Sequence, residues 1–356
     1  MRIAAVGAGF PDHYYDQEAL VAALRTYWEA RYFNVERIEQ LHRNVLVGGR
    51  HLALAMEDYP ALTTFGAAND VWIRVATEVG ERAVADGLAR AGLTVADVGA
   101  LYFVSVTGLA TPSIDARLIN RMGLPAQTKR VPIFGLGCVA GAAGIARAAD
   151  YVRAFPDEVA VLLSVELCSL TLQREDLSIP NLIASGLFGD GAAAAIVVGE
   201  ERAARAGGAL AAAPEVVATR SIFYPDSERV MGWDISERGF RLVLSPDVPK
   251  VVEEHLRGDV DTFLADHALT RRDIASWVAH PGGPKVLEAM ERALETPQGA
   301  LELTWRSLAE VGNLSSTSVL LVLRDTLAER RPPAGSLGLL LALGPGFCSE
   351  LVLLRW

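Results

Sequence analysis

The stretch "FGLGCVAGAAG", residues 134–144, decides how the rest of the chain is interpreted. It follows an apolar segment and precedes "IARAADYVRAF", so it marks the passage from a predicted strand to a predicted helix. Gly135, Gly137 and Gly141 form a GxGxxxG pattern like that of a dinucleotide-binding turn. The same turn places Cys138 at a helix N-terminus, where unpaired N–H groups and the helix dipole stabilise a thiolate. Both interpretations, a phosphate-binding turn and a cysteine nucleophile, are open at this point.

Composition excludes several classes of function. The chain has 356 residues, of which 51% are hydrophobic, and a net charge of −10. This acidic balance argues against non-specific nucleic-acid binding, which needs clustered Lys and Arg. The cysteines at 138, 168 and 348 have neither zinc-ligand nor disulfide-framework spacing, so no metal site is predicted. Without a signal peptide or an uninterrupted apolar segment of about 18 residues, we expect a cytoplasmic protein that does not span a membrane.

Strands and helices alternate along the chain, which predicts an α/β fold with largely parallel pairing. The expected strands are residues 1–9, 99–108, 129–135, 158–166, 189–199, 216–224, 274–280, 337–344 and 348–356. The expected helices are residues 16–32, 76–93, 140–156, 249–268, 284–294 and 315–330. Residues 200–215 are rich in Ala and Gly and connect two halves of similar element order. We therefore predict domains at 1–206 and 207–356.

An NADP-dependent oxidoreductase is the alternative from a different class. Glu166 ends the strand after the glycine-rich turn, where a dinucleotide-binding unit has an acidic residue for the ribose. Two features oppose this alternative. The turn lies mid-chain, behind more than a hundred residues of α/β pattern, and Cys138 occupies the position where backbone must approach a pyrophosphate.

Two further residues favour the nucleophile. His280 ends the strand "IASWVA" and leads into "PGGPK", and such strand ends are where α/β enzymes place functional groups. Asn313 precedes the helix "STSVLLVLRDTL", where an ordinary helix cap explains it equally well. A cysteine nucleophile needs a base such as His, and a charged His280 would lower the pKa of Cys138. A cysteine hydrolase would also need a group that activates water, and no such additional group is evident.

Taken together, these segments resemble the type III polyketide synthase family, the chalcone and stilbene synthase relatives. The resemblance covers nearly the whole chain and rests on "FGLGCVAGAAG", "VELCSLT", "GLFGDGAAAA", "WVAHPGGPKVLE", "VGNLSSTSV" and "LGPG", in that order. It implies a thiolase-like fold of duplicated αβαβα layers and a homodimer. It also implies CoA thioesters as substrates, no other cofactor and no carrier protein.

The resemblance also assigns the site residues. It makes Cys138 the acyl-carrying nucleophile and His280 and Asn313 its partners in a Cys-His-Asn triad. The residues that it implies for substrate binding are Phe188, a gatekeeper; Leu242, where the family has a second gatekeeper Phe; Val106, Thr107, Cys168 and Thr171, which line the cavity; Trp233, in place of a cavity-limiting glycine; and the turn Gly344, Pro345 and Gly346. The family's "GFGPG" is "ALGPG" here. Leu242 in place of Phe speaks against an aromatic starter.

The implied reaction is a decarboxylative Claisen condensation by an acyltransferase. An acyl-CoA starter would be loaded onto Cys138, because a thiolate is a strong nucleophile near neutral pH, and extended with malonyl-CoA. Two hydrogen-bond donors, on His280 and Asn313, would stabilise the enolate left by decarboxylation. The apolar lining favours an aliphatic starter and an alkylpyrone or alkylresorcinol product. The alternatives are a malonyl-CoA-only synthase of tetrahydroxynaphthalene or phloroglucinol type, and the initiating ketoacyl synthase of fatty-acid synthesis.

Overall fold

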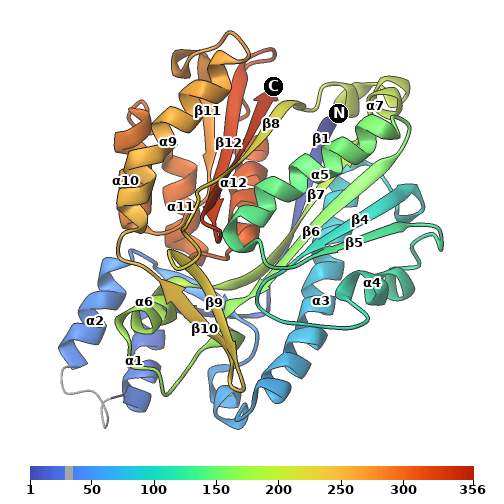
Figure 1. Cartoon of the computed structure of the whole chain (residues 1–356). Helices are drawn as coiled ribbons and strands as arrows, with labels where there is room; N and C mark the ends of the chain where they lie inside the picture. Colours follow the sequence, from blue (N-terminus) through green and yellow to red (C-terminus); the bar gives the residue numbers. More distant parts are fainter. Residues whose placement is uncertain (29–34) are drawn as a thin grey trace.

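The computed structural model describes residues 1–28 and 35–356, and Figure 1 shows the arrangement of their elements. The strands are β1 (Arg2–Gly9), β2 (His13–Asp16), β3 (Gly49–Leu52), β4 (Val98–Val104), β5 (Lys129–Ile133), β6 (Val159–Leu167), β7 (Asp190–Val198), β8 (Glu215–Phe223), β9 (Met231–Ser236), β10 (Gly239–Leu244), β11 (Ile274–Ala279), β12 (Leu337–Gly344) and β13 (Cys348–Arg355). The end of the helix expected over 16–32 lies partly outside the described residues.

The helices alternate with these strands. They are α1 (Gln17–Trp28), α2 (Val35–Asn44), α3 (Phe65–Ala91), α4 (Ile114–Met122), α5 (Ala140–Ala154), α6 (Ile179–Leu187), α7 (Glu200–Ala206), α8 (Gly208–Ala211), α9 (Val248–Ala265), α10 (Pro284–Leu294), α11 (Glu302–Val311) and α12 (Ser316–Glu329). Short 3-10 helices include η1 (Met56–Ala61), η3 (Gly137–Val139) and η4 (Cys168–Thr171). The expected strands and helices are therefore present among the described residues. Most of their ends are shifted by a few residues, but α3 begins at Phe65, well before the expected start at residue 76.

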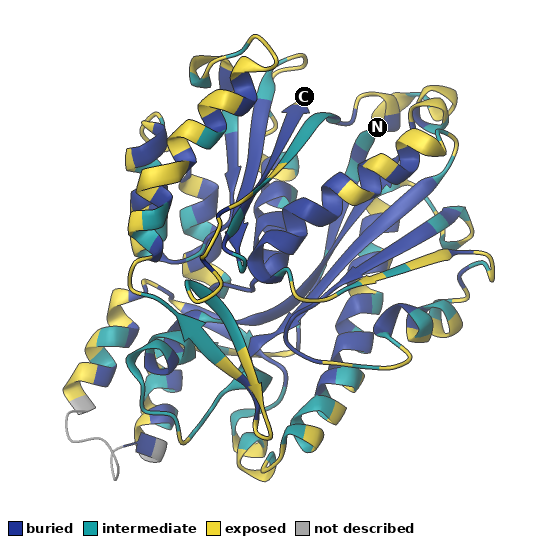
Figure 2. Cartoon of the chain, in the orientation of Figure 1, coloured by how far each residue is buried: buried dark blue, intermediate teal, exposed yellow. Residues whose placement is uncertain are grey.

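The elements form five layers, which confirms the predicted fold class. One apolar core packs α3 and α4 against β4, β6 and β7, and a second packs α9 and α10 against β11, β12 and β13. The central core contains side chains of α5 and α12 together with residues from both groups of strands. Figure 2 shows α5 and α12 largely buried, whereas the outer helices alternate between buried and exposed residues. The order of layers is therefore helix, sheet, helix, sheet, helix.

The strand pairing differs from the expectation. The strands of both halves form a nine-stranded sheet in the order β11-β12-β13-β8-β1-β7-β6-β4-β5, joined between the halves by the pair Arg2↔Glu215. Three of its pairings are parallel and five are antiparallel, as far as the structure describes the chain. A strand covered on both faces is apolar whichever way its neighbour runs, so its sequence does not reveal the direction of pairing.

Several segments have more structure than their sequence indicated. The helices α2, α4, α6 and α11 and the paired strands β2 and β3 were not expected. Two further segments are the connector and a hairpin. The connector 200–215 contains the short helices α7 and α8 instead of an irregular link. The hairpin of β9 and β10, which Figure 1 shows beneath the central layers, was not expected. Neither segment has an extended buried face, so the periodic apolar signal that marked the other elements is weak here. Among the described residues, no helix combines the length and apolarity needed to cross a bilayer.

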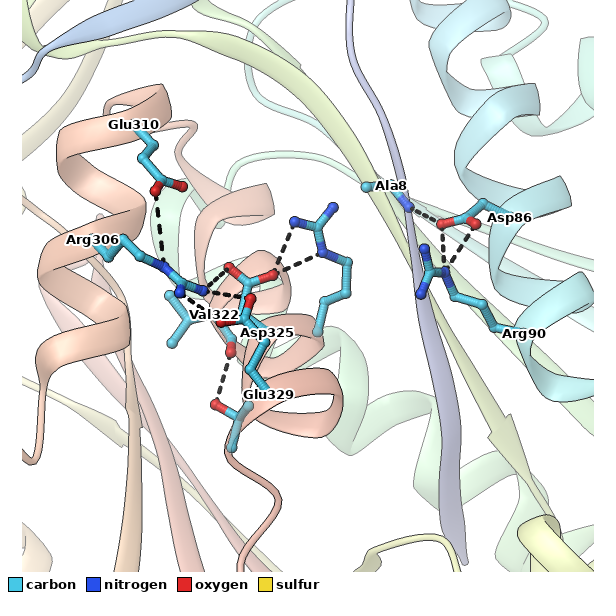
Figure 3. Close-up of polar contacts among 10 residues, drawn as sticks. Ala8, Asp86, Arg90, Arg306, Glu310, Val322, Asp325 and Glu329 are labelled. Carbon is cyan, nitrogen blue, oxygen red and sulfur yellow. Dashed lines mark hydrogen bonds and ion pairs between the residues drawn. The ribbon is translucent and has the colours of Figure 1, made fainter.

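Polar contacts tie α3 to β1 and α11 to α12 (Figure 3). Asp86 of α3 accepts a hydrogen bond from the backbone N–H of Ala8 in β1, at 3.1 Å, and is paired with Arg90. Arg306 of α11 donates to Glu329 of α12, at 2.6 and 2.7 Å, and pairs with Asp325. The contacts of Arg306 join α11 to α12, the two helices that flank the loop containing Asn313.

Candidate active site

Cys138 lies in η3, directly before α5, and is 7% exposed. Gly135 and Gly137 have φ of +98° and +55°, a conformation that side chains rarely adopt. A Cβ at Gly137 would lie 2.7 Å from Cδ of Pro345. Pro345 lies between β12 and β13, so the predicted Gly-Pro-Gly turn packs against the nucleophile turn. These contacts hold Cys138 at the helix N-terminus.

Gly141 and Gly144 lie on the buried side of α5. A Cβ at Gly141 would lie 2.3 Å from the backbone oxygen of Ser316, the first residue of α12. A Cβ at Gly144 would meet Leu162 of β6 at 2.4 Å. These two glycines allow α5 to pack closely against α12 and β6, which brings the loop before α12 to Cys138.

His280 follows β11 and is 2% exposed. Its backbone N–H donates to the oxygen of Leu341 in β12, at 3.0 Å, which ties the residue to the end of the sheet. Neither ring nitrogen has a hydrogen-bond partner among the described residues, although both are buried. Buried polar groups are normally paired, so an imidazole with two unused nitrogens is suited to bind a substrate.

Asn313 is held by its backbone and by its side chain. Its N–H donates to Leu187 at 2.9 Å and its oxygen accepts from Gly189 at 3.0 Å, so it pairs with Phe188. The side-chain oxygen accepts from the N–H of Ser315 at 2.8 Å, and Nδ2 donates to the oxygen of Gly282 at 3.2 Å. An amide nitrogen has two donors, and the second can serve a substrate.

A continuous path of hydrogen bonds joins the three predicted catalytic residues. The Sγ of Cys138 donates to Oγ of Ser315 at 3.5 Å, and Ser315 contacts Asn313 as described. Asn313 contacts Gly282, whose N–H in turn donates to the oxygen of His280 at 2.9 Å. Residues that are distant in sequence therefore meet at the ends of β11, η3 and the loop before α12.

Ser315 is a residue of the site that the sequence did not single out. Its φ is +47°, which is unusual for a residue other than glycine, and it is 5% exposed. Strained backbone of this kind tends to occur at functional sites. The motif "NLSS" showed Ser at a helix start, but helix capping was a sufficient explanation there. Only the contact with Cys138 indicates another role.

Burial dominates the electrostatics of the site. It raises the pKa of Cys138 to about 12, with a smaller lowering by the hydrogen bond to Ser315, and it lowers the pKa of His280 to about 3. The expected lowering of the thiol pKa by a charged His280 is therefore opposed by desolvation, which favours the neutral form of each group.

Glu166 has a structural role that its sequence position did not suggest. Its buried carboxylate accepts from Oγ of Ser105 at 3.3 Å, the N–H of Val106 at 3.1 Å, Oγ1 of Thr107 at 2.9 Å, and Oγ of Ser316. Both carboxylate oxygens are thus occupied by protein donors, whereas the oxidoreductase alternative required one to bind a ribose. The network ties the loop after β4 to the start of α12.

Half of the predicted substrate-binding residues gather around one small cavity of about 100 Å³. They are Cys168, Thr171, Phe188, Trp233 and Leu242. Trp233 and Leu242 face each other across the hairpin of β9 and β10, where they form a register pair. Phe188 connects this cavity to the predicted catalytic residues, because its backbone pairs with that of Asn313. Arg50 also lines the cavity and donates to the oxygen of Phe188 at 2.7 Å.

The other predicted residues lie elsewhere. Thr107 lines a second cavity of about 700 Å³. Val106 and the turn Gly344, Pro345 and Gly346 line neither of these two cavities: Val106 donates to Glu166, and the turn supports η3. Within the described part of the chain, no cluster of three or more His, Cys, Asp or Glu side chains could hold a metal ion.

Comparisons with known proteins agree with this geometry. Residues 1–201 and 215–356 match the profiles of the chalcone and stilbene synthases, N-terminal and C-terminal domain. The chain is 51% identical to 1,3,6,8-tetrahydroxynaphthalene synthase of Streptomyces peucetius subsp. caesius, over 99% of this chain and 93% of the relative. It is 38% identical to a putative chalcone synthase of Bacillus subtilis, over 99% and 98%.

The same agreement holds for the fold. A crystal structure of 1,3,6,8-tetrahydroxynaphthalene synthase from Streptomyces coelicolor A3(2), a bacterial type III polyketide synthase, superimposes with a TM-score of 0.93 and 31% identity. The superposition covers 100% of this chain and 99% of that one.

Proposed function

This chain belongs to the chalcone and stilbene synthase family and is a type III polyketide synthase, an acyltransferase, and we propose that it builds a tetrahydroxynaphthalene-type product from malonyl-CoA alone. The observation behind this proposal is the 51% identity, over nearly the whole chain, to a 1,3,6,8-tetrahydroxynaphthalene synthase. Of the two products considered from the sequence, the malonyl-CoA-only one is therefore the better supported.

Loading begins at Cys138. As a malonyl-CoA thioester approaches, the thiol passes its proton to a free ring nitrogen of His280 and the sulfur attacks the carbonyl carbon. The tetrahedral intermediate collapses, CoA leaves as the thiol, and the acyl group remains on Cys138. Burial makes each separate charge costly, so proton transfer and attack are coupled.

Extension uses His280 and Asn313 as donors. A malonyl-CoA loses CO2, and the electron pair of the broken C–C bond forms an enolate on the thioester oxygen. An imidazole N–H and the second Nδ2–H of Asn313 stabilise this charge in a site that excludes water. The enolate carbon attacks the thioester on Cys138, whose sulfur leaves as thiolate. The lengthened chain is then on CoA and can be loaded again.

A carbon-labelling experiment tests the proposal. The protein is incubated with uniformly 13C-labelled malonyl-CoA and an equal amount of unlabelled hexanoyl-CoA, and products are identified by mass spectrometry. We expect a product in which every carbon is labelled. A product that contains the unlabelled six-carbon unit would show an acyl starter instead. Absence of CO2 release and of an acyl adduct on Cys138 would contradict the polyketide synthase mechanism as such.

Phloroglucinol is a second malonyl-CoA-only product, favoured by 31% identity to phloroglucinol synthase of Pseudomonas fluorescens over 98% of this chain. The same experiment distinguishes the two products by mass.

The homodimer also belongs to the proposal. Leu109 and Phe134, 40% and 47% exposed, follow the neighbouring parallel strands β4 and β5, and exposed apolar side chains of this kind are typical of interfaces. Light scattering of the purified protein measures the molar mass.

A further inference from the structure

Arg50 of β3 is a buried cation that contacts both chain segments of the bridge between Phe188 and Asn313. The residue is 3% exposed, and its Nη1 donates to the backbone oxygen of Phe188 at 2.7 Å. Its stem lies against the residue before Asn313, because a Cβ at Gly312 would be 3.1 Å from Cδ of Arg50. The head of Arg50 therefore holds one segment while its stem supports the other.

The bridge that Arg50 contacts is small. Phe188 and Asn313 lie outside the strands of the sheet and form an isolated parallel pair. The N–H of Asn313 donates to the oxygen of Leu187 at 2.9 Å, and the N–H of Gly189 donates to the oxygen of Asn313 at 3.0 Å. These bonds use the residues on either side of Phe188, whose own carbonyl accepts from Arg50. An isolated pair has no neighbouring ladder to hold it, so its position depends on the side chains packed around it.

The strand that carries Arg50 is itself fixed at both ends. The N–H of Gly48 donates to the oxygen of Ala309, near the end of α11, at 2.7 Å. The N–H of Ala53 donates to Oδ2 of Asp190, the first residue of β7, at 2.6 Å. Arg50 lies between these two contacts in the chain, so β3 presents its side chain to the bridge from a fixed position.

The guanidinium of Arg50 is charged although it is buried. Burial lowers its pKa to about 10, which still leaves it protonated near neutral pH, and the charge of Asp190 opposes this lowering. Its Nε is buried and has no hydrogen-bond partner among the described residues. A buried charge is costly, whereas an apolar side chain of similar size would fill the same space. What the guanidinium adds is a charge-assisted hydrogen bond to Phe188, which is stronger than a neutral one.

We propose that Arg50 is a positioning residue for decarboxylation, which keeps Nδ2 of Asn313 aimed at the enolate oxygen by fixing the bridge to Phe188. This inference rests on the proposed function, because it assumes that Asn313 stabilises the enolate and takes no part in loading of Cys138. Arg50 contacts no reacting atom and acts through the bridge. A misplacement of about 1 Å in a catalytic group can cost roughly a hundredfold in rate, so a loosened bridge should be easily measured.

A double-mutant cycle tests whether Arg50 acts through Asn313. Arg50→Met keeps an unbranched side chain and removes the donor. We expect decarboxylation to fall about tenfold and loading of Cys138 to stay within about threefold of wild type. In the Asn313→Ala background the same change should alter decarboxylation by less than about twofold, because no amide is left to position. Release of CO2 from carboxyl-labelled malonyl-CoA and the mass of the intact protein give the two rates.

Two further variants serve as controls. Arg50→Lys keeps a positive charge near Asp190 and one donor on a shorter side chain. We expect it to lose only about threefold in decarboxylation, again without effect in Asn313→Ala, so it replaces Arg50→Met if that variant fails to fold. Arg2 likewise donates to a backbone oxygen, that of Ala213 at 3.0 Å, and has a buried Nε without a partner among the described residues. Arg2→Met should leave both rates unchanged.

The outcomes separate this inference from the proposed function. An unchanged rate of decarboxylation in Arg50→Met would overturn the inference. An equal loss in the wild-type and Asn313→Ala backgrounds would also overturn it, because Arg50 would then act by another route. An equal fall of loading and decarboxylation would show that Arg50 only supports the fold. Wild-type decarboxylation in Asn313→Ala would instead overturn the role of Asn313, and a wild-type protein that releases no CO2 would overturn the proposed function itself.

Discussion

Replacing Asn313 by Ala tests the division of labour in the site. The change removes Nδ2, one of the two donors for the enolate, but leaves Cys138 and His280 in place. Loss of one such donor costs about 2.7–4 kcal/mol of transition-state stabilisation, or a factor of about 10²–10³ in kcat. Loading of Cys138 does not use this donor in the mechanism above. We therefore expect decarboxylation to fall by that factor while acyl loading stays within about threefold of wild type.

The variant also loses local support, so the assay needs a control. Ala cannot accept from the N–H of Ser315 or donate to Gly282, and each buried group left unpaired costs about 1–3 kcal/mol of stability. Ser315→Ala is the matched control, because it removes the hydroxyl partner of Cys138 and keeps the amide of Asn313. For this control we expect decarboxylation close to wild type.

Two measurements give the answer. Release of CO2 from carboxyl-labelled malonyl-CoA reports decarboxylation, and the mass of the intact protein after mixing with malonyl-CoA reports loading of Cys138. Decarboxylation within about twofold of wild type in Asn313→Ala would refute the role of Asn313 as a donor, since a lost donor costs far more. An equal fall of loading and decarboxylation would show that Asn313 acts by supporting the site.

Three further predictions concern the nucleophile, the helix packing and the pH dependence of stability. Cys138→Ser should abolish the acyl adduct seen by mass spectrometry without lowering the melting temperature, because a serine hydroxyl is a far weaker nucleophile than a thiolate. Gly141→Ala should cost about 1–3 kcal/mol in denaturant unfolding, because its Cβ would overlap the backbone of α12, whereas Gly232→Ala meets nothing within 4 Å and should be neutral. Burial lowers the pKa of His42 from 6.5 to about 4 in the folded protein. As the pH falls, this histidine therefore takes up a proton in the unfolded chain before it does so in the folded one. The free energy of unfolding should fall by up to about 3 kcal/mol between pH 6.5 and pH 4. His42→Gln should have a shallower pH dependence of unfolding than wild type, and an identical one would contradict this assignment.

Much of the fold could be predicted because its signals are local. The strands β6, β7 and β12 are continuous apolar runs between turn residues, and α9, α10 and α12 have apolar residues at helical spacing. Local signals do not contain the direction of strand pairing, so the expectation of largely parallel pairing was wrong. They are also weak in the β9–β10 hairpin, where most residues are only partly buried.

The sequence by itself determined which residues are candidates for chemistry: a cysteine at a strand-to-helix turn, a histidine at a strand end and an asparagine before a helix. It also indicated the family, because order and spacing of motifs are properties of the chain. Only the tertiary structure decided that Ser315 joins Cys138 to Asn313 and that Glu166 is occupied by protein donors. These are contacts between segments far apart in sequence, and they depend on how closely α5 packs against α12, which no local pattern encodes.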